Sequence, residues 1–192
     1  VAVASTLVEL DLSENGMGSI GIEALRPAGL KLQMLSLRRN WLTSEDANVI
    51  TSLVQSMSET IVKLDLAMNK MEALGVRQLL EDLPSLPKLR CLDLSQSLFA
   101  TEAFAGARFA RLAEVAPMLE ELNLTSCRLG SHEAALQVVM SALPVTIKML
   151  HLGASDLRRP QLECVLHALR RLHRLEVLSL IQAKIDDNTA DF

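Results

Sequence analysis

The chain has 192 residues, 49% of them hydrophobic and 3% aromatic, and a net charge of −4. This length suits one or two globular domains or a single repeat array. Negative charge and few rings disfavour a nucleic-acid surface, and no run reaches the ~18 apolar residues that a transmembrane segment requires.

An eleven-residue frame begins at Leu7 and reads LVELDLSENGM, which fits the pattern L-x-x-L-x-L-x-x-N-x-L. The frame returns six times, at intervals of 25 to 30 residues. The seven copies occupy residues 7–17, 32–42, 61–71, 89–99, 119–129, 147–157 and 175–185. Self-similarity at a nearly fixed period predicts a repeat architecture.

Each copy alternates apolar and polar residues, which predicts a strand with one buried face. Between copies the apolar spacing changes to that of a helix. The predicted buried stripes are Met71, Leu74, Leu79 and Leu80 in the third repeat, and Leu162, Val165, Leu166, Leu169 and Leu172 in the sixth. Candidate helix starts are Thr43 with Asp46, Thr101, Ser131 and Pro160. A unit of strand, turn, helix and turn cannot bury its apolar faces alone, so neighbouring units must stack.

The frame resembles the leucine-rich repeat of the ribonuclease-inhibitor-like class. The spacings Met17-x3-Gly21-x3-Leu25 and Met71-x3-Gly75-x3-Leu79 match that class, whereas the sixth repeat has Gln161 in place of the glycine. The resemblance implies an α/β solenoid of about seven repeats, with a curved parallel sheet on the concave side and helices on the convex side. We expect residues 1–192 to form one such domain.

The asparagine of the frame is replaced in the later repeats. Its position holds Asn15, Asn40, Asn69, Ser97, Cys127, Ser155 and Ala183 in turn. In the family this asparagine bonds the backbone of neighbouring turns, and an alanine cannot replace it. The first three turns are therefore expected to be the more regular ones.

Neither end of the array carries a recognisable capping unit. Residues 1–6 are too few for a helix before the first strand, and the chain stops at Phe192, soon after the seventh frame. Because the exposed ends of a solenoid promote aggregation, we expect further chain or a partner to cover them.

One stretch of the first repeat imitates a nucleotide-binding loop. Residues 16–21 read G-x-G-x-x-G after a predicted strand, and Arg38 and Arg39 follow the next strand, where an NADP phosphate would lie. The repeat frame explains the same glycines, because Gly21 recurs as Gly75. A nucleotide-binding enzyme is therefore the weakest of the functional hypotheses.

Other chemical motifs are equally weak. Cys164 and His167 share a helix at metal-ligand spacing but lack a third ligand. The carboxylates Glu9, Asp11 and Glu14 fit a solvated face better than a cation site. There is no nucleophile elbow and no phosphate-binding loop. We therefore predict no catalytic residue, no cofactor, no metal and no small-molecule substrate.

The three cysteines form no C-x-x-C pair and are odd in number, which argues against a disulfide framework. We expect an intracellular, reducing compartment, the cytoplasm in preference to an organelle.

The residues between the leucines should project from the concave side. Their charges alternate in blocks along the repeats, which suits a specific protein partner better than a polyanion. Trp41 beside Arg38 and Arg39 is the best hot-spot candidate, although the ring could also fold back over the repeat edge. The predicted partner-binding residues are Met34, Arg38, Arg39, Trp41, Lys63, Asp65, Met68, Arg90, Asp93, Glu121, Met149, His151 and Ile181.

The sequence thus predicts a non-catalytic protein-interaction module, serving as a scaffold or structural subunit of a larger assembly. The alternative is a regulatory protein, because members of this class include enzyme inhibitors, sensor domains of NOD-like receptors and GTPase activators. No residue of this chain can be matched to the role of a GTPase activator.

Overall fold

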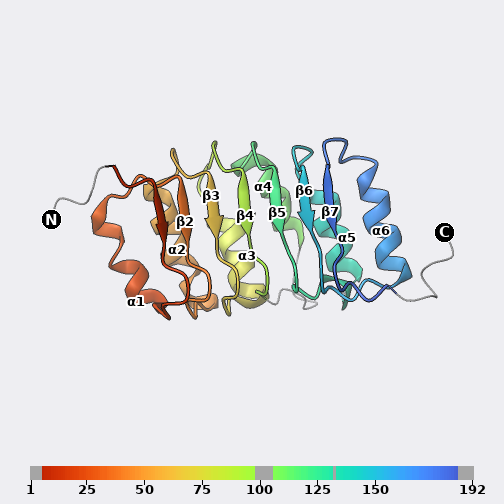
Figure 1. Ribbon diagram of the computed structural model, residues 1–192, viewed down its shortest axis with the longest axis horizontal. Helices are drawn as coiled ribbons and strands as arrows, with labels where there is room; N and C mark the ends of the chain where they lie inside the picture. The colour runs from red at the N-terminus through yellow and green to blue at the C-terminus, as the bar shows by residue number, and fades with distance from the viewer. Residues whose placement is uncertain (1–5, 98–105, 132, 186–192) are drawn as a thin grey trace.

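The computed structural model describes residues 6–97, 106–131 and 133–185. They contain seven strands of three residues each, all parallel, in a sheet whose spatial order follows the chain (Figure 1). The strands are β1 (Glu9–Asp11), β2 (Met34–Ser36), β3 (Lys63–Asp65), β4 (Cys91–Asp93), β5 (Glu121–Asn123), β6 (Met149–His151) and β7 (Val177–Ser179). Each strand lies centrally in one copy of the frame, so the predicted strands and the seven repeats are confirmed.

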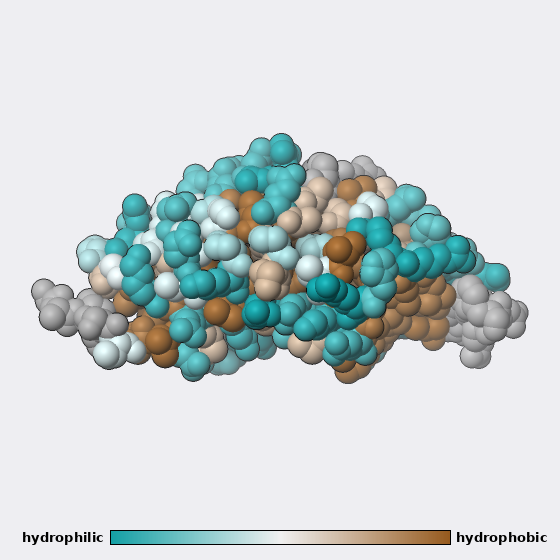
Figure 2. Space-filling view, turned by 90° about the horizontal axis from the view of Figure 1, so that it is seen from above, coloured by the Kyte–Doolittle hydropathy of each residue, from teal (hydrophilic) through white to brown (hydrophobic). Residues whose placement is uncertain are grey.

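The helices form a second layer behind the sheet (Figure 1). They are α1 (Gly18–Glu23), α2 (Ala47–Ser56), α3 (Glu72–Asp82), α4 (Arg111–Val115), α5 (Glu133–Ala142) and α6 (Arg159–Leu169). Short 3-10 helices occur at Arg26–Ala28, Ser44–Asp46, Gly106–Ala110 and Leu129–Ser131. Figure 2 shows that the molecule bulges on the side of the helices, which leaves the sheet on the inner side of the arc. No helix in the described ranges is both long and apolar enough to cross a membrane.

The core lies between these two layers. The middle leucines of consecutive strands, such as Leu64, Leu92 and Leu122, are register partners and are fully buried. Burying one such side chain stabilises the fold by about 1.5–3 kcal/mol, and each repeat adds several. The leucines thus hold every strand in the same register, and the predicted α/β solenoid is confirmed.

Two of the four predicted helix starts are confirmed. The Asp46 carboxylate accepts the backbone N–H of Thr43 at 2.7 Å and closes a capping box. Pro160 lies in the first turn of α6. The prediction for Ser131 is wrong, because this residue ends a 3-10 turn before α5. Thr101 lies outside the described residues.

The predicted helix stripes are partly wrong. Leu74 is 62% exposed and Leu166 is 41% exposed. The buried residues of α3 are Ala73, Gly75, Val76, Leu79 and Leu80, so the predicted Leu79 and Leu80 are confirmed and Leu74 is not. The spacing of the large apolar side chains alone therefore predicted wrongly that Leu74 is buried.

The asparagine ladder joins the first three turns. Asn40 accepts the N–H of Met17 at 3.1 Å and donates to the Leu12 carbonyl at 2.8 Å. Asn69 in turn accepts the N–H groups of Asn40 and Leu42, at 2.9 and 3.1 Å. These two asparagines thus join neighbouring turns, whereas Asn15 bonds only carbonyls of its own turn, and the greater regularity of the first three turns stays a prediction.

The ladder weakens in the later turns. The hydroxyl of Ser97 is buried without a hydrogen-bond partner among the described residues, and the weak thiol donor of Cys127 reaches only the carbonyls of Leu94 at 3.3 Å and Thr125 at 3.6 Å. The strand register nevertheless stays the same from β1 to β7. Loss of the asparagines therefore weakens the turns without loosening the sheet.

Candidate functional site

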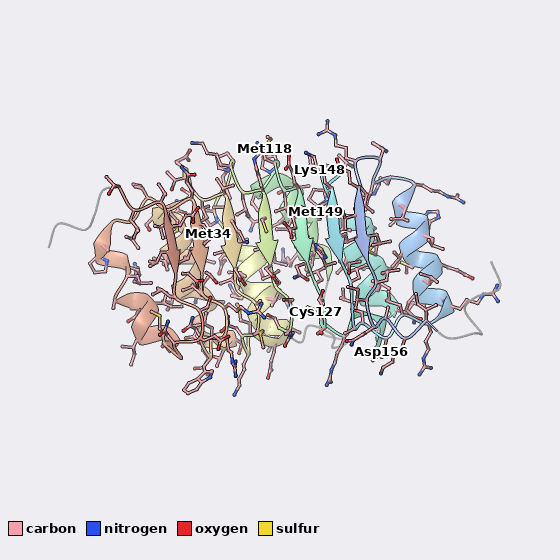
Figure 3. The ribbon with its side chains drawn as sticks, viewed as in Figure 1. Met34, Met118, Cys127, Lys148, Met149 and Asp156 are labelled. Carbon is pink, nitrogen blue, oxygen red and sulfur yellow. The ribbon has the colours of Figure 1, made fainter. Side chains whose placement is uncertain are left out.

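The open face of the sheet carries two straight rows of side chains. The first row contains Glu9, Met34, Lys63, Cys91, Glu121, Met149 and Val177, and the second contains Asp11, Ser36, Asp65, Asp93, Asn123, His151 and Ser179. Both rows follow from strand alternation, because the leucine between them points to the helices. Figure 3 shows Met34 and Met149 on this face, and Lys148 at the edge where the strands begin.

Seven of the thirteen predicted partner-binding residues lie in these rows. They are Met34, Lys63, Glu121 and Met149 in the first row and Asp65, Asp93 and His151 in the second. Arg90 precedes the first row, while Arg38, Arg39, Trp41, Met68 and Ile181 follow the strands. The repeats therefore place the predicted residues along one face, from its first repeats to its last.

A hydrogen-bonded polar chain runs along the second row. The Ser36 hydroxyl donates to Asp65 at 3.2 Å, and the Asn123 amide donates to Asp93 at 2.9 Å. Asp65 and Asp93 are register partners. Burial raises the pKa of Asp65, the N–H of Ala67 lowers it, and repulsion from Asp93 raises it again. The centre of the face is thus a pair of adjacent carboxylates.

Ion pairs join neighbouring repeats. The Glu120 carboxylate receives Arg90 at 2.7 Å and Lys148 at 3.1 Å, and Arg39 pairs with Glu14 at 3.1 Å. The blocks of charge in the sequence therefore partly neutralise one another across repeat boundaries. Sequence reasoning missed Glu120 as a site residue, and its position beside Arg90 and Lys148 in equivalent slots of adjacent repeats was the available signal.

Lys63 differs from these basic residues. Its side chain is exposed and forms no ion pair or hydrogen bond with the described residues. Its neighbour Cys91 has a pKa raised to about 12, mainly by burial and then by the nearby Glu121. The thiol is therefore protonated at neutral pH and is no nucleophile.

Trp41 lies over the first repeat. A Cβ built on Gly16 would meet the indole ring at 3.4 Å, yet Trp41 is 67% exposed. The ring thus packs on the repeat edge and still presents a face to solvent, and its role as a binding hot spot stays a prediction. The two arginines predicted to lie beside Trp41 have different partners. Arg38 Nη2 lies 2.8 Å from Met68 Sδ, whereas Arg39 forms an ion pair with Glu14.

The structure gives the glycine-rich stretch a role in its turn and places the cysteine–histidine pair in a groove between helices. Gly16 and Gly18 adopt left-handed φ angles of 59° and 57°, and Gly21 packs against Met17 of its own repeat. Cys164 and His167 line a groove between α5 and α6. Within the described ranges no three histidine, cysteine or carboxylate side chains are grouped closely enough to hold a metal ion.

Comparison with known proteins finds leucine-rich repeats both in a family model and in curated sequence relatives. A family described as leucine-rich repeat matches residues 3–25 and 115–131. The chain is 31% identical over 179 residues to human NACHT, LRR and PYD domains-containing protein 12, covering 91% of this chain and 17% of that protein. It is also 31% identical over 188 residues to mouse ribonuclease inhibitor, covering 92% and 40% respectively.

A solved structure shares the fold. The leucine-rich repeat-containing protein LegL7 from Legionella pneumophila superposes with a TM-score of 0.64 at 19% identity, over 95% of this chain and 59% of that one. The chain spans less than half the length of the two relatives matched by sequence. Repeat frame, sheet and relatives agree, and the chain belongs to the leucine-rich-repeat proteins, with repeats of the ribonuclease-inhibitor-like class that serve as a protein-interaction module.

Proposed function

We propose that the open face of the sheet binds a protein partner and that the chain is a scaffold or structural subunit of a larger assembly. One observation carries the proposal: all seven repeats contribute side chains to two aligned rows on an exposed face. Such a surface presents a wide, rigid template without any assembled catalytic group among the described residues. Large repeated surfaces of this kind are characteristic of solenoid binding proteins.

The chemistry of the face supports a protein partner with both charged and apolar contacts. Ile181, at the β7 end, is 73% exposed, and Trp41 offers its ring at the other end. Between them, Asp65 and Asp93 form a carboxylate pair that a basic side chain of the partner would neutralise. Apolar and aromatic anchors with charged neighbours are typical of interface hot spots.

The proposal predicts that Lys63→Glu and Trp41→Ala each weaken partner binding. Neither side chain is needed to fill the core, so circular dichroism spectra should stay unchanged. Binding should fall about tenfold or more for the tryptophan, the usual loss at a hot spot. The measurement is the affinity of each purified variant for the protein that co-purifies with the chain in fixed stoichiometry.

Two matched controls separate the open face from the rest of the surface. Lys88→Glu reverses an exposed lysine outside the strands, and Leu74→Ala truncates an exposed apolar residue on α3. Both should bind like the unaltered chain. Equal losses in the controls, or full affinity of both test variants, would reject the open face as the binding surface.

A regulatory role is the second candidate. It is supported by the 31% identity to mouse ribonuclease inhibitor, a protein named for inhibiting an enzyme. In that case the purified chain should slow a ribonuclease, or change the rate of a GTPase, at stoichiometric concentration. A scaffold subunit should leave both rates unchanged and remain bound to its assembly.

The nucleotide-binding hypothesis has a direct test. The Trp41 ring covers Gly16, where a phosphate would have to approach the loop. NADP should therefore produce no thermal shift, whereas a bound ligand would raise stability by RT ln(1 + [L]/Kd).

The three free cysteines of the described residues fit a reducing compartment, which is part of the same proposal.

A further inference from the structure

A groove separates α5 from α6 on the convex side, away from the open face of the sheet. Its volume is about 770 Å³. Its lining consists of Gln137, Met140 and Ser141 from α5, Cys164, His167 and Ala168 from α6, and Arg170, Arg171 and His173 from the turn that follows. This lining is basic at one end and contains no carboxylate.

The grooves between earlier helices carry charges of both signs. Glu23 and Arg26 line the groove between α1 and α2, and Glu45 and Arg77 line the groove between α2 and α3. These two grooves are thus charge-balanced, whereas the charged residues that line the α5–α6 groove are all basic. In a chain with a net charge of −4, this concentration of positive charge is a local feature that the repeat frame does not require.

Only part of the positive charge in the α5–α6 groove is needed to cap the ends of the two helices. Arg171 donates to the carbonyl of Met140 at 3.1 Å, near the end of α5. The end of α6 carries the equivalent of about half a negative charge. Arg170 and Arg174 exceed this need, and Arg170 is exposed with no ion pair among the described residues.

The carboxylates nearest to the groove lie at its other end or are already paired. Glu163 pairs with Arg159 at 3.1 Å in the first turns of α6. Glu133, the first residue of α5, repels the Cys164 thiolate and adds to the effect of burial in raising the pKa of that thiol. Positive charge is therefore concentrated where α6 ends.

The groove is also apolar at its base. Met140 and Ala168 lie beneath it and are almost fully buried, so the apolar surface comes from the half-buried Cys164 and the aliphatic stems of Arg170 and Arg171. Long basic side chains commonly cover apolar surface while their charged ends stay in water. A ligand that fits this lining combines an apolar stripe with carboxylates along one side.

We propose that the α5–α6 groove docks an acidic amphipathic helix of a partner protein, with its carboxylates on Arg170 and His173 and its apolar side chains over Cys164 and the aliphatic stems of the two arginines. An amphipathic helix lying in a groove between two helices is a common mode of peptide recognition. This convex site is separate from the open face of the sheet, so it adds a second attachment point to the proposed function.

The test uses two fluorescein-labelled helical peptides of 15 residues and the full chain. One peptide carries leucines on one face and glutamates on the other, and its twin has lysine in place of every glutamate. Fluorescence anisotropy should give the acidic peptide an affinity about tenfold or more above that of the basic twin. Arg170→Gln and Arg170→Glu should weaken binding of the acidic peptide progressively.

Two further variants test the place of binding. Gln137→Trp, on the exposed side of α5, should obstruct the groove without changing its charge. Arg26→Glu, in the α1–α2 groove, makes the same charge reversal elsewhere and should bind like the unaltered chain. Circular dichroism spectra confirm that each variant folds.

Three results would overturn the proposal. The first is equal binding of the two peptides, and the second is an equal loss with Arg26→Glu and Arg170→Glu. The third is binding of the chain to vesicles containing phosphatidylserine, or to single-stranded RNA, without binding of the acidic peptide. That last outcome would assign the groove to a polyanion in place of a protein.

Discussion

At the scale of single residues, the second row of the sheet sets the character of the open face. Four of its side chains, Asp11, Asp65, Asp93 and Asn123, accept a hydrogen bond from the backbone N–H two residues later. This bond turns the chain out of each strand, so the residue serves the fold as well as the surface. The sequence predicted Asp65 and Asp93 as surface residues, but this structural role needs the three-dimensional turn to be recognised.

Asp65 is the residue where the two roles conflict. Because its pKa is raised above the ordinary value of 3.8, the folded protein holds this proton more tightly than the unfolded chain does. The resulting stabilisation is present below pH 3.8 and is lost as the pH rises through the raised pKa. At neutral pH the charged carboxylate is therefore unfavourable, first because it is partly buried and then because Asp93 repels it.

We expect Asp65→Asn to stabilise the protein at pH 7 by about 0.5 kcal/mol, the size of a screened interaction between like charges. Asn123 already shows that an asparagine fits this slot, since its Oδ1 accepts the N–H of Thr125 at 3.0 Å. Urea unfolding at several pH values measures the effect, and the gain should vanish below the ordinary pKa. A variant that is less stable at pH 7 would contradict this account of Asp65.

At the scale of the repeat element, the third residue after each strand has a left-handed backbone. The residues concerned are Glu14, Arg39, Met68, Gln96, Ser126, Ala154 and Gln182, with φ between 51° and 63°. For a residue other than glycine this conformation costs roughly 1–2 kcal/mol. The repeat bears this cost in every copy, because the turn brings the next leucine back into the core.

Ala154 offers the cleanest test of that cost. Ala154→Gly should stabilise the protein by about 1 kcal/mol, since the left-handed conformation suits glycine and the N–H still donates to the Ile181 carbonyl at 2.8 Å. Ala135→Gly, the same change inside α5, should destabilise it by about 1 kcal/mol. Thermal unfolding compares the two, and a loss of stability in both variants would show that the turn is not strained.

Strands and helices differ in how far the sequence predicts them. The strands could be placed because the leucine alternation is repeated seven times. The helix faces could not be placed fully, since Leu74 looks buried by spacing but lies outside a face that Ala73 and Val76 set. Small residues such as these also form the buried face of a helix, and a prediction based only on the spacing of large apolar residues misses them.

At the scale of the whole molecule, the arc divides its surface into an inner sheet and an outer layer of helices (Figures 1 and 2). The sequence was sufficient for this division and for most residues of the open face. It was insufficient for the ion pairs of Glu120, which join three repeats, and for the α5–α6 groove, which only the packing of two helices creates. A single domain over residues 1–192 stays a prediction.

The central claim is that the partner lies against the open face of the sheet, and lysine footprinting of the native assembly tests it most directly. Lys63 lies in the first row and forms no ion pair with the part of the chain that the structure describes, whereas Lys88 is an exposed lysine outside the strands. Acetylation of the chain alone and within its assembly, read by mass spectrometry, compares the two side chains. We predict that Lys63 becomes protected in the assembly while Lys88 stays reactive. Continued reactivity of Lys63 together with protection of Lys88 would contradict the account.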